Sequence, residues 1–227
     1  MSGRPDGWRI PGTADLPLRP VTKTDLAYVQ IRQKILEGDL APETALDQEA
    51  LADSLGLSTT PVREALRRLE SERLVVSRAH RETVVAPLSL DIMEEVYAVR
   101  FSLDPLAAAL AATEADADER DQIAGVSLDR PDKDDPLSEV YFNRHLHRSI
   151  YAASGNTTLI EILDSLWDLS DRYWLIAAKD SRPFTAAGQE HAAIVAAVVE
   201  GKPDLAAELM REHLRATLRR IRAAVTD

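Results

Sequence analysis

Four polar residues in the C-terminal half of the chain have the types and the spacing of a metal site. Asn143 and His147 are four positions apart, which places both side chains on one face of a single helix. His191 and His213 belong to two other predicted helices. Three imidazoles and one amide oxygen would suit zinc, nickel or manganese if the helices converge. The alternative is that all four are ordinary polar residues on helix surfaces, and the spacing alone leaves it open.

DNA recognition is the second kind of chemistry that the sequence suggests, and it centres on a helix that begins at Pro61. Arg63 and Arg67 are four positions apart and share a face directed away from the apolar residues of that helix, so both can enter a groove. Hydroxyl groups and free backbone amides at its N-terminal end can bind phosphate oxygens. The hydroxyl residues there are Ser58, Thr59 and Thr60. A solvated arginine-rich face is the alternative.

The distribution of charge favours the DNA interpretation. Residues 58–81 carry six arginines against three glutamates, whereas the whole chain has 38 acidic and 27 basic residues and a formal net charge of -11. The net charge excludes a uniformly basic coat. A local excess of positive charge within an acidic protein indicates a confined surface for DNA.

Three short helices are predicted around these arginines. The first spans about residues 25–37 with Thr24 as its cap, and the second spans residues 47–55 and is closed by a glycine. The third begins at Pro61, with Thr60 as its cap. Two helices joined by a short turn, the second with outward arginines, are typical of a helix-turn-helix.

A hairpin follows these helices and would make the unit winged. Its predicted strands, residues 74–76 and 83–86, are rich in β-branched side chains, and the segment between them contains His80 and Arg81. We therefore predict a winged helix-turn-helix domain over residues 21–86.

Long helices without strand patterns are predicted from residue 87 onward. Ser89 caps the first of them, which has roughly 20 residues. Its predicted inner face consists of Ile92, Val96, Val99, Leu103, Leu106 and Leu110. Residues 114–137 are acidic and contain prolines, so we expect a loop with at most a short helix. Further helices are predicted at residues 138–153, 158–180 and 185–200, and from Pro203 almost to the end. The expected fold class is mainly α, with an all-helical bundle over residues 87–227.

Length and composition narrow the class of protein further. The 227 residues suffice for two modest domains, and residues 1–20, with four prolines and three glycines, are expected to form a flexible leader. The absence of cysteine excludes a disulfide scaffold, a thiolate zinc finger and a cysteine nucleophile. The chain has no apolar run near the roughly 20 residues of a membrane span and no signal-peptide pattern, so we expect a cytoplasmic protein without a membrane partner.

One motif is far more specific than a general helix-turn-helix pattern. Residues 58–66 have the sequence S-T-T-P-V-R-E-A-L, and residues 35–42 have the sequence I-L-E-G-D-L-A-P. With these segments the sequence resembles the GntR family of bacterial transcription regulators. The resemblance implies that Ser58, Thr60 and Arg63 contact double-stranded operator DNA and that the protein acts as a homodimer on a palindromic operator.

The resemblance also implies that the wing near His80 and Arg81 approaches the minor groove. Four positions depart from the usual family pattern. Glu43 and Glu82 stand where glycines are usual, Thr59 where arginine is frequent, and Glu49 where some relatives have a DNA-contacting arginine. The mode of binding therefore carries over to this chain, but the operator sequence does not.

Residues 88–220 resemble the C-terminal ligand-binding domain of the FadR-type branch, the all-helical FCD domain. The matching segments are Y-A-V-R at 97–100, L-D-P-L-A at 103–107, N-R-H-L-H-R-S-I at 143–150, A-S-G-N at 153–156, E-H-A-A-I at 190–194 and R-E-H-L at 211–214. In metal-binding members, an Asp or Asn and three histidines hold a divalent cation that binds a small carboxylate. The corresponding ligands here are Asn143, His147, His191 and His213, and zinc is the expected metal, with nickel and manganese as alternatives.

The first ligand is an asparagine, so the predicted ligand set is neutral and the site keeps a charge of about +2. The resemblance places Arg100 in the pocket as a further positive charge that binds the effector. We therefore expect an organic anion, such as a sugar acid or a di- or tricarboxylate, that releases a repressor from its operator.

Two alternative functions deserve comparison. A metal-dependent hydrolase would need a general base, for which Glu190 beside His191 is a candidate. Adjacent helical positions diverge by about 100°, so Glu190 is expected at the surface or behind the ligands, and we predict that the protein is not an enzyme. A metal-responsive regulator without an organic effector is closer, but it leaves Arg100 without a role.

Overall fold

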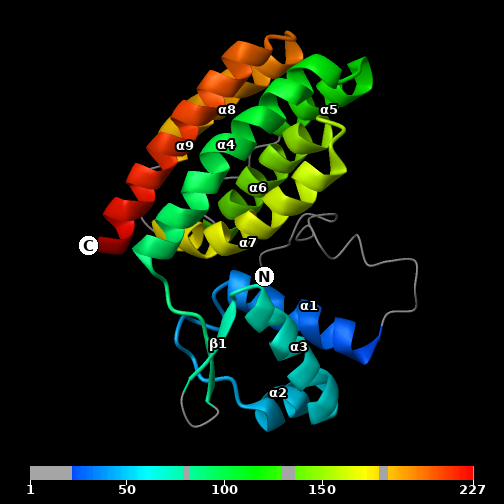
Figure 1. Ribbon diagram of the computed structural model, residues 1–227, viewed down its shortest axis with the longest axis vertical. Helices are drawn as coiled ribbons and strands as arrows, with labels where there is room; N and C mark the ends of the chain where they lie inside the picture. The colour runs from blue at the N-terminus through cyan, green and yellow to red at the C-terminus, as the bar shows by residue number, and fades with distance from the viewer. Residues whose placement is uncertain (1–21, 79–81, 129–135, 179–183, 227) are drawn as a thin grey trace. The chain divides into compact units, whose positions relative to one another are not determined.

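The computed structural model describes residues 22–78, 82–128, 136–178 and 184–226, which form nine helices and a two-stranded sheet (Figure 1). The expected mainly α fold is confirmed. The chain divides into two compact units, Met1–Leu88 and Ser89–Asp227. In the described part of the chain, we find no helix that is both long enough and apolar enough to cross a membrane.

The N-terminal unit contains three helices followed by a hairpin. The helices are α1 (Lys23–Leu36), α2 (Gln48–Leu55) and α3 (Thr59–Ser71), and the strands are β1 (Val75–Ser77) and β2 (Thr83–Val85). α3 packs against both α1 and α2, and the antiparallel strands pair Val76 with Val84. This is the arrangement of a winged helix-turn-helix.

Two helix starts in this unit differ from those predicted. Thr22, instead of Thr24, is the N-cap of α1, because its hydroxyl and the carboxylate of Asp25 form a reciprocal capping box. Ser58 occupies the N-cap position of α3, so this helix begins before Pro61 and its first turn includes Thr60. The hydroxyl residues near the arginines therefore form part of the helix end itself.

The C-terminal unit consists of six helices: α4 (Leu90–Glu114), α5 (Ala117–Leu128), α6 (Pro136–Ala152), α7 (Thr157–Ala178), α8 (Phe184–Val199) and α9 (Pro203–Thr226). α4 lies along α9 and also contacts α6, α7 and α8 (Figure 1). Ser89 caps α4 as predicted. The backbone N–H and C=O groups of Ser89 are both hydrogen-bonded to the hydroxyl of Tyr173 on α7, each at 2.8 Å.

We expected residues 114–137 to form a loop with at most a short helix, but a helix of 12 residues, α5, occupies half of that segment. Asp116 and Glu119 form a second capping box, in which each carboxylate accepts a hydrogen bond from the other's backbone N–H, at 2.9 and 3.0 Å. Ile123 of this helix is buried. The abundance of acidic residues indicated a loop, but acidic residues also stabilise the first turn of a helix.

The predicted inner face of α4 was also partly wrong. Val99 and Leu106 are 46% and 47% exposed, respectively. The side chains buried instead include Met93, Tyr97, Arg100, Asp104, Ala107 and Ala108. The prediction followed the large aliphatic residues, whereas the actual inner face combines alanines with an arginine and an aspartate. This polar part of α4 faces the site described next.

Candidate DNA-binding surface and metal site

α3 exposes the arginines that the sequence analysis assigned to DNA. Val62, Leu66 and Leu69 are buried against the rest of the N-terminal unit, whereas Arg63 and Arg67 are exposed. Arg67 forms an exposed ion pair with Glu64, at 3.0 Å. Such pairs contribute little to stability, so the guanidinium can exchange this partner for a phosphate or a base.

The N-terminus of α3 has the features of a phosphate-binding helix end. Ser58, Thr59 and Thr60 are all exposed, and the hydroxyl of Ser58 makes no capping hydrogen bond. The first turn contains no acidic residue. The free backbone N–H groups and the positive end of the helix dipole therefore face solvent without a competing carboxylate.

An exposed ion pair joins the base of the wing to the segment between α1 and α2. Arg78, which follows β1, lies 2.7 Å from the carboxylate of Glu43. Glu43 has a φ angle of 67°, in the left-handed region that glycine adopts most readily. His80 and Arg81, which we assigned to the wing, lie outside the described residues.

The three histidines predicted as metal ligands come together in the C-terminal unit. His147 on α6, His191 on α8 and His213 on α9 are buried, and one ligand atom from each lies within 4.8 Å of the others. Nε2 of His191 is 3.3 Å from Nε2 of His147 and 3.3 Å from Nε2 of His213. Two nitrogens bound to one tetrahedral zinc ion would be about 3.3 Å apart.

In His147 and His213, the hydrogen bonds made by Nδ1, on the side of the ring away from the cluster, determine which ring nitrogen carries the proton. The hydroxyl of Tyr151 donates to Asp104 at 2.7 Å, so its oxygen must accept from Nδ1 of His147, at 3.0 Å. Nδ1 of His213 is 2.7 Å from the carboxylate of Glu190, which can only accept. In the neutral rings of His147 and His213, both Nε2 lone pairs are therefore directed at the cluster.

The environment also favours neutral imidazoles. Burial lowers the pKa of His147 well below its ordinary value of 6.5, and the neighbouring His213 and His191 lower it further. Burial also lowers the pKa of His213, although its hydrogen bond to Glu190 opposes the shift. If Nε2 of His191 carries a proton, it can donate to Nε2 of His147 or to Nε2 of His213, but not to both. A cation among the three nitrogens would satisfy all of them.

Asn143 provides an independent test of whether the residues fit a metal. Its side chain is 3% exposed, and neither its amide oxygen nor its nitrogen has a hydrogen-bond partner among the described residues. Leaving a buried amide unsatisfied costs roughly 1–3 kcal/mol. Asn143 precedes His147 by one helical turn, so its oxygen is a suitable fourth ligand. The residues present therefore fit a divalent cation, and His145, which is exposed, lies outside this set.

Arg100, the predicted effector contact, is buried and already paired. It is 1% exposed and lies 2.7 Å from Asp104, and its guanidinium also donates to the hydroxyl of Ser170 at 3.2 Å. The guanidinium carbon is 4.2 Å from the centre of the Trp167 ring. Asp104 and Tyr151 were not among the predicted site residues. Asp104 follows Arg100, and Tyr151 follows His147, by four positions, which is the spacing that indicated Asn143 and His147.

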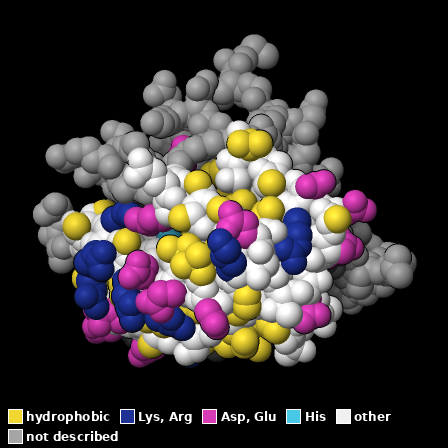
Figure 2. Space-filling model, turned by 90° about the horizontal axis from the view of Figure 1, so that it is seen from above, with side chains coloured by type: hydrophobic (Ala, Val, Ile, Leu, Met, Phe, Trp, Pro, Cys, Tyr) yellow, Lys and Arg dark blue, Asp and Glu magenta, His cyan; other side chains and the backbone are white. Residues whose placement is uncertain are grey.

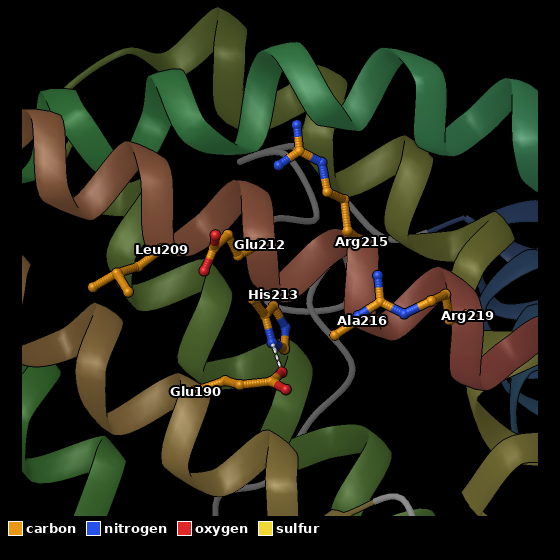
Figure 3. A pocket seen from close by; sticks show the side chains of 7 residues that line it. All are labelled: Glu190, Leu209, Glu212, His213, Arg215, Ala216 and Arg219. Atoms are coloured by element: carbon orange, nitrogen blue, oxygen red, sulfur yellow. Dashed lines mark hydrogen bonds and ion pairs between the residues drawn. The ribbon is translucent and has the colours of Figure 1, made fainter.

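A surface pocket of about 360 Å³ reaches the outer side of the cluster, between α8 and α9 (Figure 3). It is lined by Glu190, Leu209, Glu212, His213, Arg215, Ala216 and Arg219. Figure 3 shows the hydrogen bond between His213 and Glu190 at its edge. The histidine cluster is otherwise enclosed, and cyan side chains are almost absent from the face drawn in Figure 2, where basic, acidic and apolar side chains are interspersed.

Comparison with known proteins agrees with this division of the chain. Residues 95–216 match the FCD domain, and residues 23–85 match the bacterial regulatory proteins of the gntR family. A transcriptional regulator in an unstable DNA locus of Streptomyces ambofaciens is 32% identical over 209 residues, which cover 86% of this chain and 85% of that protein.

The chain belongs to the GntR family. GntR regulators bind operator DNA, and FCD domains bind small-molecule effectors. Another relative, the transcriptional repressor GlaR of Escherichia coli, is 28% identical over 86% of this chain and 93% of its own length. The solved structure of E. coli McbR/YncC has the same fold, with a TM-score of 0.77 and 19% identity over 90% of this chain and 99% of that one. Such regulators are not enzymes, which excludes the hydrolase alternative.

The backbone of Glu43 agrees with the glycine that the family resemblance led us to expect at this position. Its φ angle of 67° is a conformation that glycine adopts most readily. In this chain a glutamate adopts that conformation and its carboxylate binds Arg78. Glu49 and Thr59 are exposed at the starts of α2 and α3, and Glu82 is exposed beside β2.

Proposed function

We propose that this GntR-family protein is a repressor that binds a palindromic operator as a homodimer and is released by a small organic anion at a metal site. The observation that carries the proposal is the convergence of three imidazoles, together with the buried, unsatisfied amide of Asn143 one helical turn before His147. All of these groups are buried within the domain that binds effectors in this family. A regulator of bacterial DNA would act in the cytoplasm.

The protein side of the site has two tasks in this proposal. Asn143, His147, His191 and His213 would hold a divalent cation, with zinc as the first expectation and nickel and manganese as alternatives. The cation would supply a positive charge that attracts a carboxylate. Tyr151 and Glu190 orient two of the rings, so the nitrogens are arranged before the metal arrives.

Arg100 would bind a second anionic group of the effector. Its present partner is Asp104, so an incoming carboxylate would have to share or replace that aspartate. To release DNA, the effector must bind the DNA-incompetent arrangement more tightly than the competent one. A coupling of about 1–3 kcal/mol would change operator affinity roughly 5- to 150-fold.

The same Arg100–Asp104 pair favours a second candidate function, a metal-responsive regulator without an organic effector. Asp104 already neutralises the charge that would attract a carboxylate to Arg100. The two candidates differ in what changes operator binding. Binding that responds to removal and return of the metal alone, and not to any di- or tricarboxylate or sugar acid, would support the second.

The first experiment is to measure metal per protomer in dialysed, tag-free protein by elemental mass spectrometry. We expect near-stoichiometric metal in the wild type, and its loss in His147→Ala and His213→Ala. His145→Ala is the matched control, because His145 lies on the same helix but is exposed. Unchanged metal content in both test variants would refute the site, and no metal even after reconstitution would refute the metal-dependent function.

For the DNA-binding part, an operator fragment bound by the full-length protein should dissociate steeply as salt increases, because phosphate contacts release counterions. A flat salt response would contradict the assignment of the surface around α3. The size of the complex with a palindromic fragment would report whether two protomers bind.

A further inference from the structure

Glu190 connects the buried histidine cluster to the protein surface. Its Oε2 atom accepts a hydrogen bond from Nδ1 of His213 at 2.7 Å and another from Arg220 at 3.1 Å. Arg220 also donates to Oε1 of the same carboxylate. The side chain of Glu190 is 27% exposed, whereas that of His213 is 2% exposed. The carboxylate is therefore held between a buried ring and a partly exposed guanidinium.

The opposite side of the cluster is organised differently. There Nδ1 of His147 faces the hydroxyl of Tyr151, and the carboxylate of Asp104 lies beyond the tyrosine. Of the two rings, only His213 donates directly to an anion. A carboxylate in that position increases the electron density on the other ring nitrogen, which makes it a stronger metal ligand than a phenol would.

We infer that Glu190 is a positioning residue that sets the metal affinity of the cluster, by holding His213 with Nε2 deprotonated and by strengthening Nε2 as a ligand. Arg220 fixes the carboxylate in the orientation that this requires. This role rests on the metal site proposed above. The competing explanation is that Glu190 and Arg220 form a structural ion pair between α8 and α9 that happens to touch His213.

The pocket in Figure 3 supplies a matched control for this role. Glu212 lines the same pocket, is exposed and precedes His213 in the sequence, but Figure 3 shows its carboxylate directed away from the ring. Glu212→Gln therefore removes one negative charge from the same pocket without removing a partner of the ligand. Glu190→Gln removes the charge but keeps an oxygen that can accept the Nδ1–H hydrogen bond.

The experiment is a titration of the metal-free, full-length protein with Zn²⁺ against a chromophoric chelator, and with Co²⁺ by its absorption. We expect Glu190→Gln to lower the affinity for Zn²⁺ by about 10- to 100-fold and to change the Co²⁺ spectrum. Glu212→Gln should stay within about twofold of the wild type and keep its spectrum. Glu190→Asp, which retains the charge, should bind more tightly than Glu190→Gln.

The possible results separate the two proposals. If the wild type binds Zn²⁺ and Glu190→Gln matches it, the role of Glu190 is refuted and the metal site stands. Equal losses in Glu190→Gln and Glu212→Gln would also refute it, because they would indicate a general effect of pocket charge. A wild type that takes up neither ion refutes the metal site and the role of Glu190 together. If Glu190→Gln does not fold, Arg220→Gln decides, because it leaves the carboxylate of Glu190 but removes the group that fixes its orientation. An affinity and a Co²⁺ spectrum equal to those of the wild type in Arg220→Gln would refute the positioning role.

Discussion

The recognition helix α3 and the histidine cluster use the same spacing in opposite ways. Arg63 and Arg67 on α3, like Asn143 and His147 on α6, are one helical turn apart. On α3 this spacing directs both side chains to solvent, and Arg67 pairs with Glu64, another exposed residue of the same helix. In the cluster it directs both side chains into the core, where His147 meets His191 from α8.

This difference in burial determines how much free energy the loss of an ion-pair partner costs in each region. An exposed ion pair such as Glu64–Arg67 is screened by water and is easily exchanged for DNA. The buried pair Arg100–Asp104 cannot lose one member without leaving an unpaired charge in the core. The surface that we propose for DNA can thus change partners, whereas the buried Arg100–Asp104 pair of the C-terminal unit cannot do so without a large cost.

The largest expected effect comes from Asp104→Ala. Removing this carboxylate leaves Arg100 buried without its ion-pair partner, which should lower the free energy of unfolding by about 3–5 kcal/mol. Urea unfolding followed by circular dichroism measures this change. Glu64→Gln, which breaks the exposed pair with Arg67, is the control and should cost at most about 1 kcal/mol. Equal losses of unfolding free energy in the two variants would contradict the difference that we infer between the buried and the exposed ion pair.

A smaller effect, confined to DNA binding, is expected for Arg63→Ala. Loss of a base or phosphate contact from α3 should weaken operator binding by about 1–3 kcal/mol, with no change in metal content. Fluorescence anisotropy with an operator fragment reports the affinity. Arg219→Ala, at an exposed position on α9, should bind DNA like the wild type. A metal content that falls in Arg63→Ala would show that the two sites are not separable in this way.

The smallest effect concerns the pH dependence of the metal-free protein. Because the folded protein lowers the pKa of His147 below 6.5, the unfolded chain binds more protons as the pH falls below that value. Unfolding should therefore become easier toward acidic pH, with a slope of at most about 1.4 kcal/mol per pH unit for each such imidazole. His147→Ala should show a shallower slope than the wild type. Identical slopes in the two proteins would contradict a buried neutral His147.

More of the surface around α3 than of the histidine cluster could be predicted from the sequence. The exposed arginines, the hydroxyl residues and the fold of the N-terminal unit follow from local spacing and turn residues within about 60 positions. Even there, the cap of α3 was misplaced by two residues, because both Ser58 and Thr60 are good capping residues.

In the C-terminal unit, the histidines could be identified, but the residues that orient them could not. Tyr151 and Asp104 resemble ordinary helix residues until packing brings α4 against α6. The exposed Val99 and buried Arg100 show why the inner face of α4 was partly misjudged, since hydrophobicity alone ranks them the other way round. A buried polar network depends on tertiary partners, which no single helical period encodes.

The double hydrogen bond between Tyr173 and Ser89 has a mechanical consequence. α4 begins directly after Ser89, and residues 86–89, which include Pro87, separate it from the end of β2. Arg100 lies about 15 Å along the same helix, at 1.5 Å per residue. Tyr173 ties the residue before α4 to α7. A shift of α4 or α7 near Arg100 would therefore also move the residue at which the short connection from β2 ends.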